Sequence, residues 1–295
     1  MNLNQLDAFV HVAEHGSFSK AALVLGIAQP ALSRQVRALE TELHEALLLR
    51  HGRGVRLTEA GRRLLEHCHG IRHMVAQARS DLLAQRDEPV GQVVVAMPPT
   101  LARQHTLPLI QAFRAKLPKA RLAIVEGFSV VLTEWLLTGR VDLALVYNPA
   151  PLPALHISPL RIEKLCLVSA ADQAPSGPVT LQELAAGYSL VMPQRGQIFR
   201  TLMESSAALA GVQLQVGWEV SSVPAILDLV AAGIGHAALG ENAVRCARHP
   251  SQLVMTPFAG VEISSMLCLV SPARERTTPL LQRTAVLLTE LAYAG

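Results

Sequence analysis

The chain is poor in aromatic residues, cysteine and net charge, and each shortage limits what the protein can be. Aromatic residues make up 4% of the 295 residues, and the four cysteines show no paired spacing. A disulfide framework is therefore not expected, and a reducing cytoplasm is the default location, although a redox switch through two cysteines stays open. The net charge of +3 does not by itself indicate a nucleic-acid partner.

Long hydrophobic runs and catalytic motifs are also missing. No stretch reaches about 18 apolar residues without a charge, so no membrane span is expected. Asp7 and Glu14 interrupt the first predicted helix, so no signal peptide is expected. No GxSxG, Walker or HExxH pattern occurs, so we predict no catalytic residue, no cofactor and no enzyme activity. Half of the residues are hydrophobic, which predicts about two globular domains.

One group of histidines has the residue types of a metal site. His67, Cys68, His69 and His73 lie close in the sequence, with His69 and His73 at i and i+4. Cys68 is expected to face away from His69, and no acidic residue or further cysteine completes the four ligands that zinc needs. We therefore predict a solvated helix face and no metal site.

The segment from Ser17 to Thr58 carries the pattern of a DNA-binding motif. Two short helices are predicted around a tight turn at Gly26, and the second has Leu32, Val36 and Leu39 at the spacing of one buried face. The opposite face presents small, hydrogen-bonding and cationic side chains, which suit a major groove. A basic, glycine-containing hairpin follows. A helix-turn-helix with a basic wing predicts double-stranded DNA as a partner.

Specific DNA contacts follow from this arrangement. Gln29, Ser33 and Arg34 are expected to face the bases, and Arg37 the phosphates. Arg53 and Arg56 in the wing are expected to reach the minor groove or the backbone. The predicted DNA-binding residues are Gln29, Pro30, Ser33, Arg34, Arg37, Arg53 and Arg56.

The same segment resembles the N-terminus of LysR-type transcriptional regulators. The pattern AxxLxIAQPALSRQVxxLExEL is followed by RxGRGVxLTxAG, so helix, turn, recognition helix, wing and the opening of a linker helix come in the family's order. The chain departs from the family at His44, where Gly is usual, at Leu48, where Phe is usual, and at Gly240, where Pro is usual. His44 is expected to adopt a left-handed conformation at the end of its helix.

A long linker helix is predicted after the wing, with Thr58 as its N-cap. Its apolar residues recur in alternating steps of four and three, which is the heptad seam of a coiled coil. The seam consists of Leu64, Cys68, Ile71, Val75, Ala78 and Leu82. We expect a homodimer through this helix, with packing on its own domain as the alternative, and the resemblance implies a homotetramer.

Strands and helices alternate through the rest of the chain, after a Pro-Gly break at residues 87–91. The first half reads as a β-α-β-α-β order, which predicts a parallel sheet covered by helices. Its predicted elements are strands at 92–97, 121–126 and 142–146 and helices at 100–117 and 129–138. A second α/β half begins near Glu163 with a strand at 165–169. Segments near 161–167 and 263–269 are expected to cross between the two halves.

The predicted fold class is α/β with an N-terminal all-α winged helix-turn-helix, a long linker helix and a two-lobed effector domain. The two lobes resemble the type 2 periplasmic-binding-protein fold, which the LysR resemblance also implies. We place the DNA-binding domain at residues 1–58, the linker at 59–88 and the effector-binding domain at 89–295. Lobe I covers about 91–162 and 267–295, and lobe II about 163–266.

A ligand site is expected where strands end and helices begin, because helix N-termini direct backbone N–H groups outward. Thr100, Ser129 and Ser222 can cap helices there and still offer hydroxyl groups, although a purely capping role is an equally good interpretation. The predicted effector-binding residues are Pro99, Thr100, Phe128, Ser129, Arg195, Phe199 and Ser222. Helix N-termini together with Arg195 favour a small anionic effector.

The sequence therefore predicts a cytoplasmic LysR-type regulator that binds an inverted-repeat operator and responds to a small effector between two lobes. The alternative is a ligand-binding protein or enzyme of α/β class with an accessory DNA-binding module. A missing export signal argues against a transport protein, and missing catalytic motifs argue against an enzyme. The identity of the effector and the regulated genes do not follow from the sequence.

Overall fold

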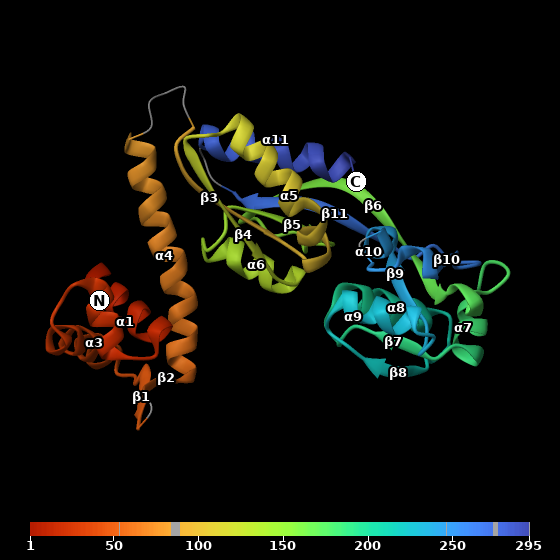
Figure 1. The fold of residues 1–295 in the computed structure, drawn as a ribbon, viewed down its shortest axis with the longest axis horizontal. Helices are drawn as coiled ribbons and strands as arrows, with labels where there is room; N and C mark the ends of the chain where they lie inside the picture. The colour runs from red at the N-terminus through yellow and green to blue at the C-terminus, as the bar shows by residue number, and fades with distance from the viewer. Residues whose placement is uncertain (53, 84–88, 246, 274–276, 295) are drawn as a thin grey trace. The chain divides into compact units, whose positions relative to one another are not determined.

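A computed structural model describes residues 1–52, 54–83, 89–245, 247–273 and 277–294. The chain divides into two compact units. The first unit consists of Met1–Arg79 with Thr138–Arg140, and the second of Ser80–Leu137 with Val141–Gly295. Within the described ranges, no helix is long and apolar enough to cross a membrane. Figure 1 follows the chain from its N-terminus to its C-terminus.

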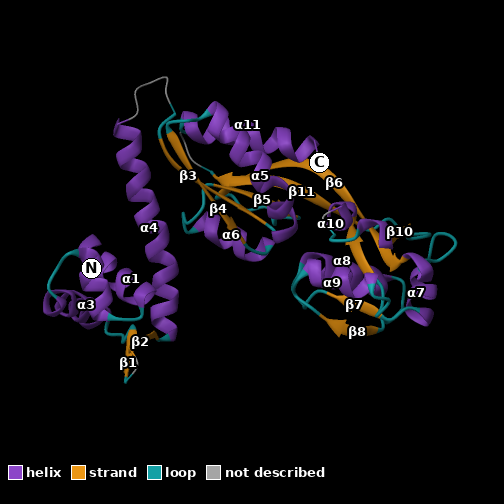
Figure 2. Cartoon of the chain, viewed as in Figure 1, coloured by secondary structure: helices purple, strands orange, loops and turns teal. Residues whose placement is uncertain are grey.

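The first unit is a helical domain with a small hairpin (Figure 2). Its elements are α1 (Leu3–His15), α2 (Phe18–Leu25), α3 (Gln29–Leu43), β1 (Leu48–His51), β2 (Gly54–Leu57) and α4 (Glu59–Leu83). The apolar faces of the first three helices close around one core that includes Phe9, Leu32 and Leu39, none of which is exposed. This is the predicted helix-turn-helix followed by a two-stranded wing.

Local sequence signals set the ends of these helices. Asn2 forms a capping box with Gln5 at the start of α1, and Ser17 caps α2. Thr58 accepts a hydrogen bond from the backbone N–H of Gly61 at 2.9 Å, so its predicted capping role for α4 is confirmed. His44 ends α3 with a φ of 53°, which confirms the left-handed conformation expected there.

The second unit begins with a parallel sheet. Its first elements are β3 (Gly91–Met97), α5 (Pro99–Lys116), β4 (Ala120–Glu126), α6 (Ser129–Leu137) and β5 (Leu143–Tyr147). β3 lies between β4 and β5 and is parallel to both. Alternate residues of β3 face opposite ways: Val93 and Val95 pack with α5, and Val94 and Ala96 pack with α6. The predicted strand-helix alternation is confirmed.

Two long antiparallel strands connect this sheet to the rest of the unit. They are β6 (Leu155–Ala170) and β11 (Ser264–Pro272), which pair from Ser264 with Lys164 to Pro272 with Leu155. The elements between them are η1 (Ala171–Gln173), α7 (Leu181–Gly187), β7 (Leu190–Met192), α8 (Ile198–Leu209), β8 (Val216–Glu219), α9 (Val223–Ala231), β9 (Ala237–Gly240), α10 (Glu241–Arg245), η2 (Pro250–Gln252) and β10 (Leu253–Pro257). Helix α11 (Pro279–Ala294) follows β11. The two predicted crossing segments lie on β6 and β11.

Three elements differ from the prediction. Strand β6 begins at Leu155, ten residues before the predicted strand, because its early part pairs with β11 although its sequence does not alternate regularly. Strand β10 was not predicted, and it forms by pairing with the last residues of β6. The short helix α10 was also missed, since five residues carry too little periodicity to indicate a helix.

The predicted seam of α4 is only partly available to a second copy. Cys68 is fully buried in the core of the first unit, and Leu64 and Ile71 pack against that core. Val75 is half-buried and Ala78 is exposed. The side chain of Leu82 lies outside the described residues. The first half of the seam therefore packs on its own domain, which was the alternative interpretation, and the second half carries the prediction of a dimer.

Candidate DNA-binding surface and effector cavity

The first half of α3 presents the predicted groove residues on one outward face. Gln29, Pro30, Arg34 and Arg37 are exposed, and Ser33 is half-buried. Their positions repeat at i, i+4 and i+8, so they share one side of the helix, while the other side is buried in the core. The surface offers amide, hydroxyl and guanidinium groups, which can donate hydrogen bonds to base edges and phosphates.

The wing is a two-stranded ribbon in which Leu49 pairs with Arg56. Arg56 is exposed on this ribbon. Arg53, the other predicted wing contact, lies outside the described residues. The ribbon is joined to the end of α1, because the backbone N–H of Val55 donates to the carbonyl oxygen of Gly16 at 2.9 Å. A side chain at Gly54 would put its Cβ atom 2.6 Å from that same oxygen, so this contact requires glycine.

Glu40 connects α3 to the wing and was not predicted. Its Oε1 atom accepts hydrogen bonds from the backbone N–H groups of Leu47 and Leu48 at 2.9 and 3.1 Å. Those two residues enter the wing, so one carboxylate on the recognition helix orients the start of the ribbon. The sequence shows only a Glu seven and eight residues before its partners, and no local rule relates such positions.

A cavity of about 1180 Å³ in the second unit brings all seven predicted effector residues together. They come from the starts of α5, α6 and α8 and from the N-cap of α9. These segments follow the carboxyl ends of β3, β4, β7 and β8. Pro99, Thr100, Phe128, Ser129, Arg195, Phe199 and Ser222 line the cavity, and Arg103, Gln194, Gln197 and Thr201 line it as well.

The three hydroxyl residues do not have the common capping role that the sequence suggested. Ser222 is an N-cap, and it accepts from the backbone N–H of Ala225 at 3.5 Å. Ser129 lies inside the first turn of α6, and its hydroxyl oxygen accepts from the backbone N–H of Tyr147 at 3.2 Å. Thr100 is the second residue of α5, whose N-cap is Pro98 without a side-chain hydrogen bond. Thr100 and Ser129 therefore lie inside their helices rather than at the N-cap, so the capping interpretation holds for Ser222 alone among these three.

The two predicted aromatic walls differ in burial. Phe128 is 40% exposed, whereas Phe199 is 9% exposed and belongs to the main core of the second unit. The ring of Phe199 is tilted against that of Tyr147, with centroids 5.3 Å apart. Phe199 thus supports the cavity wall and the core together, while Phe128 presents a free apolar surface to a ligand.

A buried arginine holds the rim of the cavity at the start of α8. Arg200 is 2% exposed and donates to Glu204 at 2.6 Å, to Glu219 at 3.2 Å and to the carbonyl oxygen of Pro193 at 3.1 Å. Arg195 is exposed, and its Nε atom lies 3.8 Å from Glu204. The buried guanidinium therefore fixes the loop that carries Arg195. Sequence reasoning missed Arg200, whose only local signal is an acidic residue four positions later.

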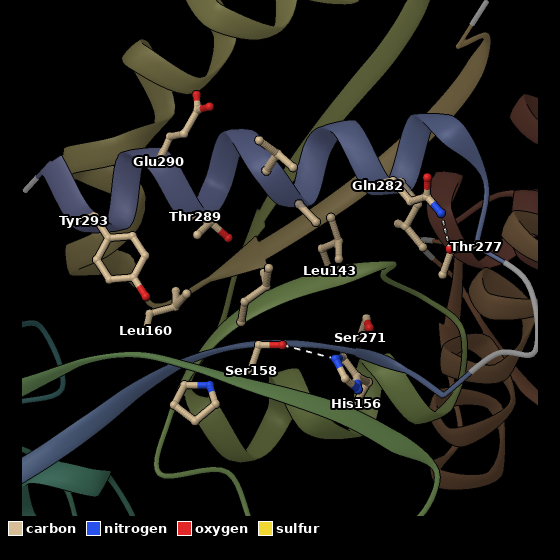
Figure 3. Close-up of a pocket in the computed structure, with 15 residues that line it drawn as sticks. Leu143, His156, Ser158, Leu160, Ser271, Thr277, Gln282, Thr289, Glu290 and Tyr293 are labelled. Atoms are coloured by element: carbon tan, nitrogen blue, oxygen red, sulfur yellow. Dashed lines mark hydrogen bonds between the residues drawn. The ribbon is translucent and has the colours of Figure 1, made fainter. Parts of the chain in front are cut away.

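A second hollow of about 530 Å³ lies between α11 and the strands β6 and β11. Figure 3 shows Leu143 and Leu160 on its floor, Tyr293 on α11, and the hydrogen bond between His156 and Ser158. No predicted effector residue lines this hollow.

The described cysteines are poor candidates for a redox switch. Cys68, Cys166 and Cys268 are free thiols. Burial raises the pKa of Cys68 to about 11, and it also raises the pKa values of Cys166 and Cys268. A raised pKa reduces the thiolate fraction that oxidation requires. The fourth cysteine, Cys246, lies outside the described residues.

Gly240, where the family usually has Pro, faces a buried carboxylate. A Cβ atom at this position would lie 2.5 Å from Oε1 of Glu163. The same oxygen accepts from the backbone N–H of Asn242 at 3.2 Å. Glycine is therefore the residue that lets β9 approach the Glu163 side chain on β6.

Comparison with known proteins matches both parts of the chain to family models. Residues 3–62 match the "bacterial regulatory helix-turn-helix protein, lysR family", and residues 86–292 match the "LysR substrate binding domain". The nitrogen assimilation regulatory protein nac of Escherichia coli (strain K12) is 33% identical over 98% of this chain and 94% of its own length. The regulator ShiR of Corynebacterium glutamicum (strain R) is 33% identical over 80% of this chain and 81% of its own length.

Solved structures agree over the whole chain. Full-length BenM is 26% identical, with a TM-score of 0.59 over 100% of this chain and 97% of its own. Full-length CbnR, solved in complex with its target DNA, has a TM-score of 0.73 at 24% identity and covers 99% of this chain and 100% of its own, which shows a shared fold.

Proposed function

The chain belongs to the LysR family of transcriptional regulators, with a helix-turn-helix domain that binds DNA and a domain that binds an effector, and from this premise we propose which residues carry each activity and how the chain assembles. The function is regulation of transcription, so the alternative of an enzyme is set aside.

DNA recognition is assigned to α3 and the wing. Gln29, Ser33 and Arg34 read base edges, with Pro30 beside them, and Arg37 binds phosphate. Arg53 and Arg56 extend the contact along the backbone or into the minor groove. The support is that the described members of this set lie on exposed or half-buried surface while the opposite face of α3 is buried.

Two copies are proposed to read an inverted-repeat operator. A two-fold symmetric dimer places two recognition helices on two half-sites, so the symmetry of the operator follows that of the protein. The dimer forms through α4, where Val75 and Ala78 are not part of the chain's own core. Pairing of effector domains then yields a homotetramer. Because its target is genomic DNA, the protein acts in the cytoplasm.

The effector is proposed to be a small anionic molecule held in the large cavity of the second unit. The observation that carries this proposal is that seven residues, predicted from four separate segments, line one cavity. Helix N-termini favour an anion. Among the described residues that line the cavity, Arg103 and Arg195 are cationic and Glu126 is acidic. Phe128 supplies apolar contact to the ligand's body.

Effector binding is proposed to act through the two crossing strands. We divide the chain into a DNA-binding domain at 1–58, a linker at 59–88 and an effector domain at 89–295, with lobes at about 91–162 plus 267–295 and about 163–266. β6 and β11 join the lobes, so a ligand gripped from both can bias their arrangement. It can do so only if it binds one arrangement more tightly than the other.

A substitution in the cavity tests the effector site. A thermal-shift screen of small organic acids and sulfonates first identifies a ligand, because binding to the native state raises the unfolding midpoint. Thr100→Val then removes a hydroxyl while nearly conserving volume. We expect the midpoint shift and the response to that ligand to be lost, with operator affinity unchanged.

The matched control is Thr106→Val, which makes the same change on the same helix outside the cavity lining. It should keep the ligand response. If Thr100→Val responds to the ligand like the unmodified protein and differs only by a lower unfolding temperature, the cavity assignment is wrong.

A further inference from the structure

The last turn of α1 gathers three side chains of the types that bind transition metals. His11, Glu14 and His15 lie at i, i+3 and i+4, so they share one face of the helix. Their potential ligand atoms all lie within 4.8 Å of one another. None of the three belongs to the α3 face or wing residues assigned to DNA or to the effector cavity.

We propose that His11, Glu14 and His15 form a binding site for a divalent transition-metal ion of the zinc class. Two imidazoles and one carboxylate suit Zn²⁺ and its neighbours, whereas Mg²⁺ and Ca²⁺ prefer oxygen ligands alone. Three protein ligands leave a fourth position of a tetrahedral ion open to water or to another side chain.

The donor atoms lie up to 4.8 Å apart, which is wider than a bound ion requires. A tetrahedral zinc site with bonds of about 2.0–2.2 Å has its donor atoms about 3.3–3.6 Å apart. Glu14 is exposed and free to change rotamer, and both histidines are half-buried. Binding an ion therefore requires the donor atoms to move closer by rotation about side-chain bonds, which the exposed side chain of Glu14 allows.

Each histidine has a ring nitrogen that no hydrogen bond to a described residue occupies. Nδ1 of His15 lies 2.9 Å from the carbonyl oxygen of His11, so that nitrogen donates its proton and Nε2 is left with a lone pair for a metal. Nδ1 of His11 is buried and has no hydrogen-bond partner among the described residues. A buried ring nitrogen without a partner is costly, and a bound cation would satisfy it.

The position of the site gives the ion a structural consequence. Gly16 follows His15 directly, and its carbonyl oxygen holds the backbone N–H of Val55 in the wing at 2.9 Å. An ion bound to the last turn of α1 would therefore stabilise the segment that supports the wing. Because it binds the native state, it would also raise the unfolding temperature.

The test uses the full-length protein after treatment with a chelator. Titration calorimetry with Zn²⁺ measures affinity and stoichiometry, and the visible absorption of Co²⁺ reports tetrahedral coordination. We expect one ion per chain, with zinc binding weakened at least about tenfold in His15→Gln and in Glu14→Gln. Glu14 is exposed, so its substitution should leave the fold intact.

The matched control is His67→Gln, which removes an exposed histidine of the same unit outside the cluster. It should bind zinc like the unmodified protein. The proposal is overturned if Glu14→Gln and His15→Gln keep full affinity, or if all three variants lose affinity equally, which would indicate adventitious binding to surface histidines.

Discussion

At the scale of single residues, a few side chains decide whether the DNA-binding elements keep their geometry. Glu40 fixes the start of the wing to α3, and Gly54 allows the ribbon to approach the end of α1. His44 adopts a left-handed conformation that costs more than it would for glycine, which the family usually has here. These residues position the exposed side chains that we propose contact DNA.

Arg34→Ala tests direct recognition at this scale. Arg34 is exposed on the outward face of α3 and makes no part of the core, so its loss should spare the fold. We expect specific binding to weaken by about 1–3 kcal/mol, with less discrimination between operator and random DNA. Footprinting and a thermal melt measure the two effects.

Arg114→Ala is the control, because it removes an exposed arginine from α5 in the other unit. If Arg34→Ala occupies the operator as well as the control does, Arg34 is not part of the recognition surface.

At the scale of secondary-structure elements, α4 serves two purposes along its length. Its first half contributes Leu64, Cys68 and Ile71 to the core of the first unit. Its second half continues the apolar repeat through Val75 and Ala78 without joining that core. A charge placed in the first half would disrupt both the core of the first unit and any dimer. Only a substitution in the second half can therefore distinguish dimer formation from folding.

Val75→Asp is therefore the informative change in α4. A charge buried between two helices is strongly unfavourable, so we expect sedimentation to show smaller species and operator binding to fall. Ala76→Asp places the same charge on the exposed neighbouring face and should sediment like the unmodified protein. Identical sedimentation of both variants would mean that this part of α4 is not the interface.

At the scale of the whole molecule, partly buried histidines relate stability to pH. Burial lowers the pKa values of His69, His105 and His236, and Arg161 lowers that of His105 further. The folded protein thus favours neutral rings. Above the ordinary histidine value of 6.5, folded and unfolded chains are both neutral at these sites. As pH falls through that value, the unfolded chain takes up protons first, and stability declines.

His105→Gln tests this linkage, because His105 is the most buried of the three at 3% exposure. The free energy of unfolding, measured by denaturant at about pH 7.5 and about pH 5.5, should fall less in the variant than in the unmodified protein. His249→Gln alters an exposed ring and should keep the full decline. Equal pH dependence in all three proteins would exclude His105 as a contributor.

The order of elements and the surface of the recognition helix followed from the sequence alone. Periodicity marked α3, because an amphipathic helix records in its spacing which face is buried. The alternation of strand and helix patterns predicted the parallel sheet. The positions where the predicted strands end predicted the residues that line the cavity. Each of these features depends on residues that are close together in the sequence, so the spacing of residue types is enough to predict it.

Tertiary structure alone decided which distant groups meet. Three contacts depend on packing between separate segments of the chain. They are the hydrogen bond from the wing to Glu40, the hydrogen bond from Arg200 to Glu219, and the close approach of Gly240 to Glu163. The early part of β6 and the strand β10 are strands because of their partners. Packing also decided which part of the α4 seam joins the core of the first unit and which part stays outside it. A stripe of apolar residues shows that a helix face is buried, but it does not show which partner buries it.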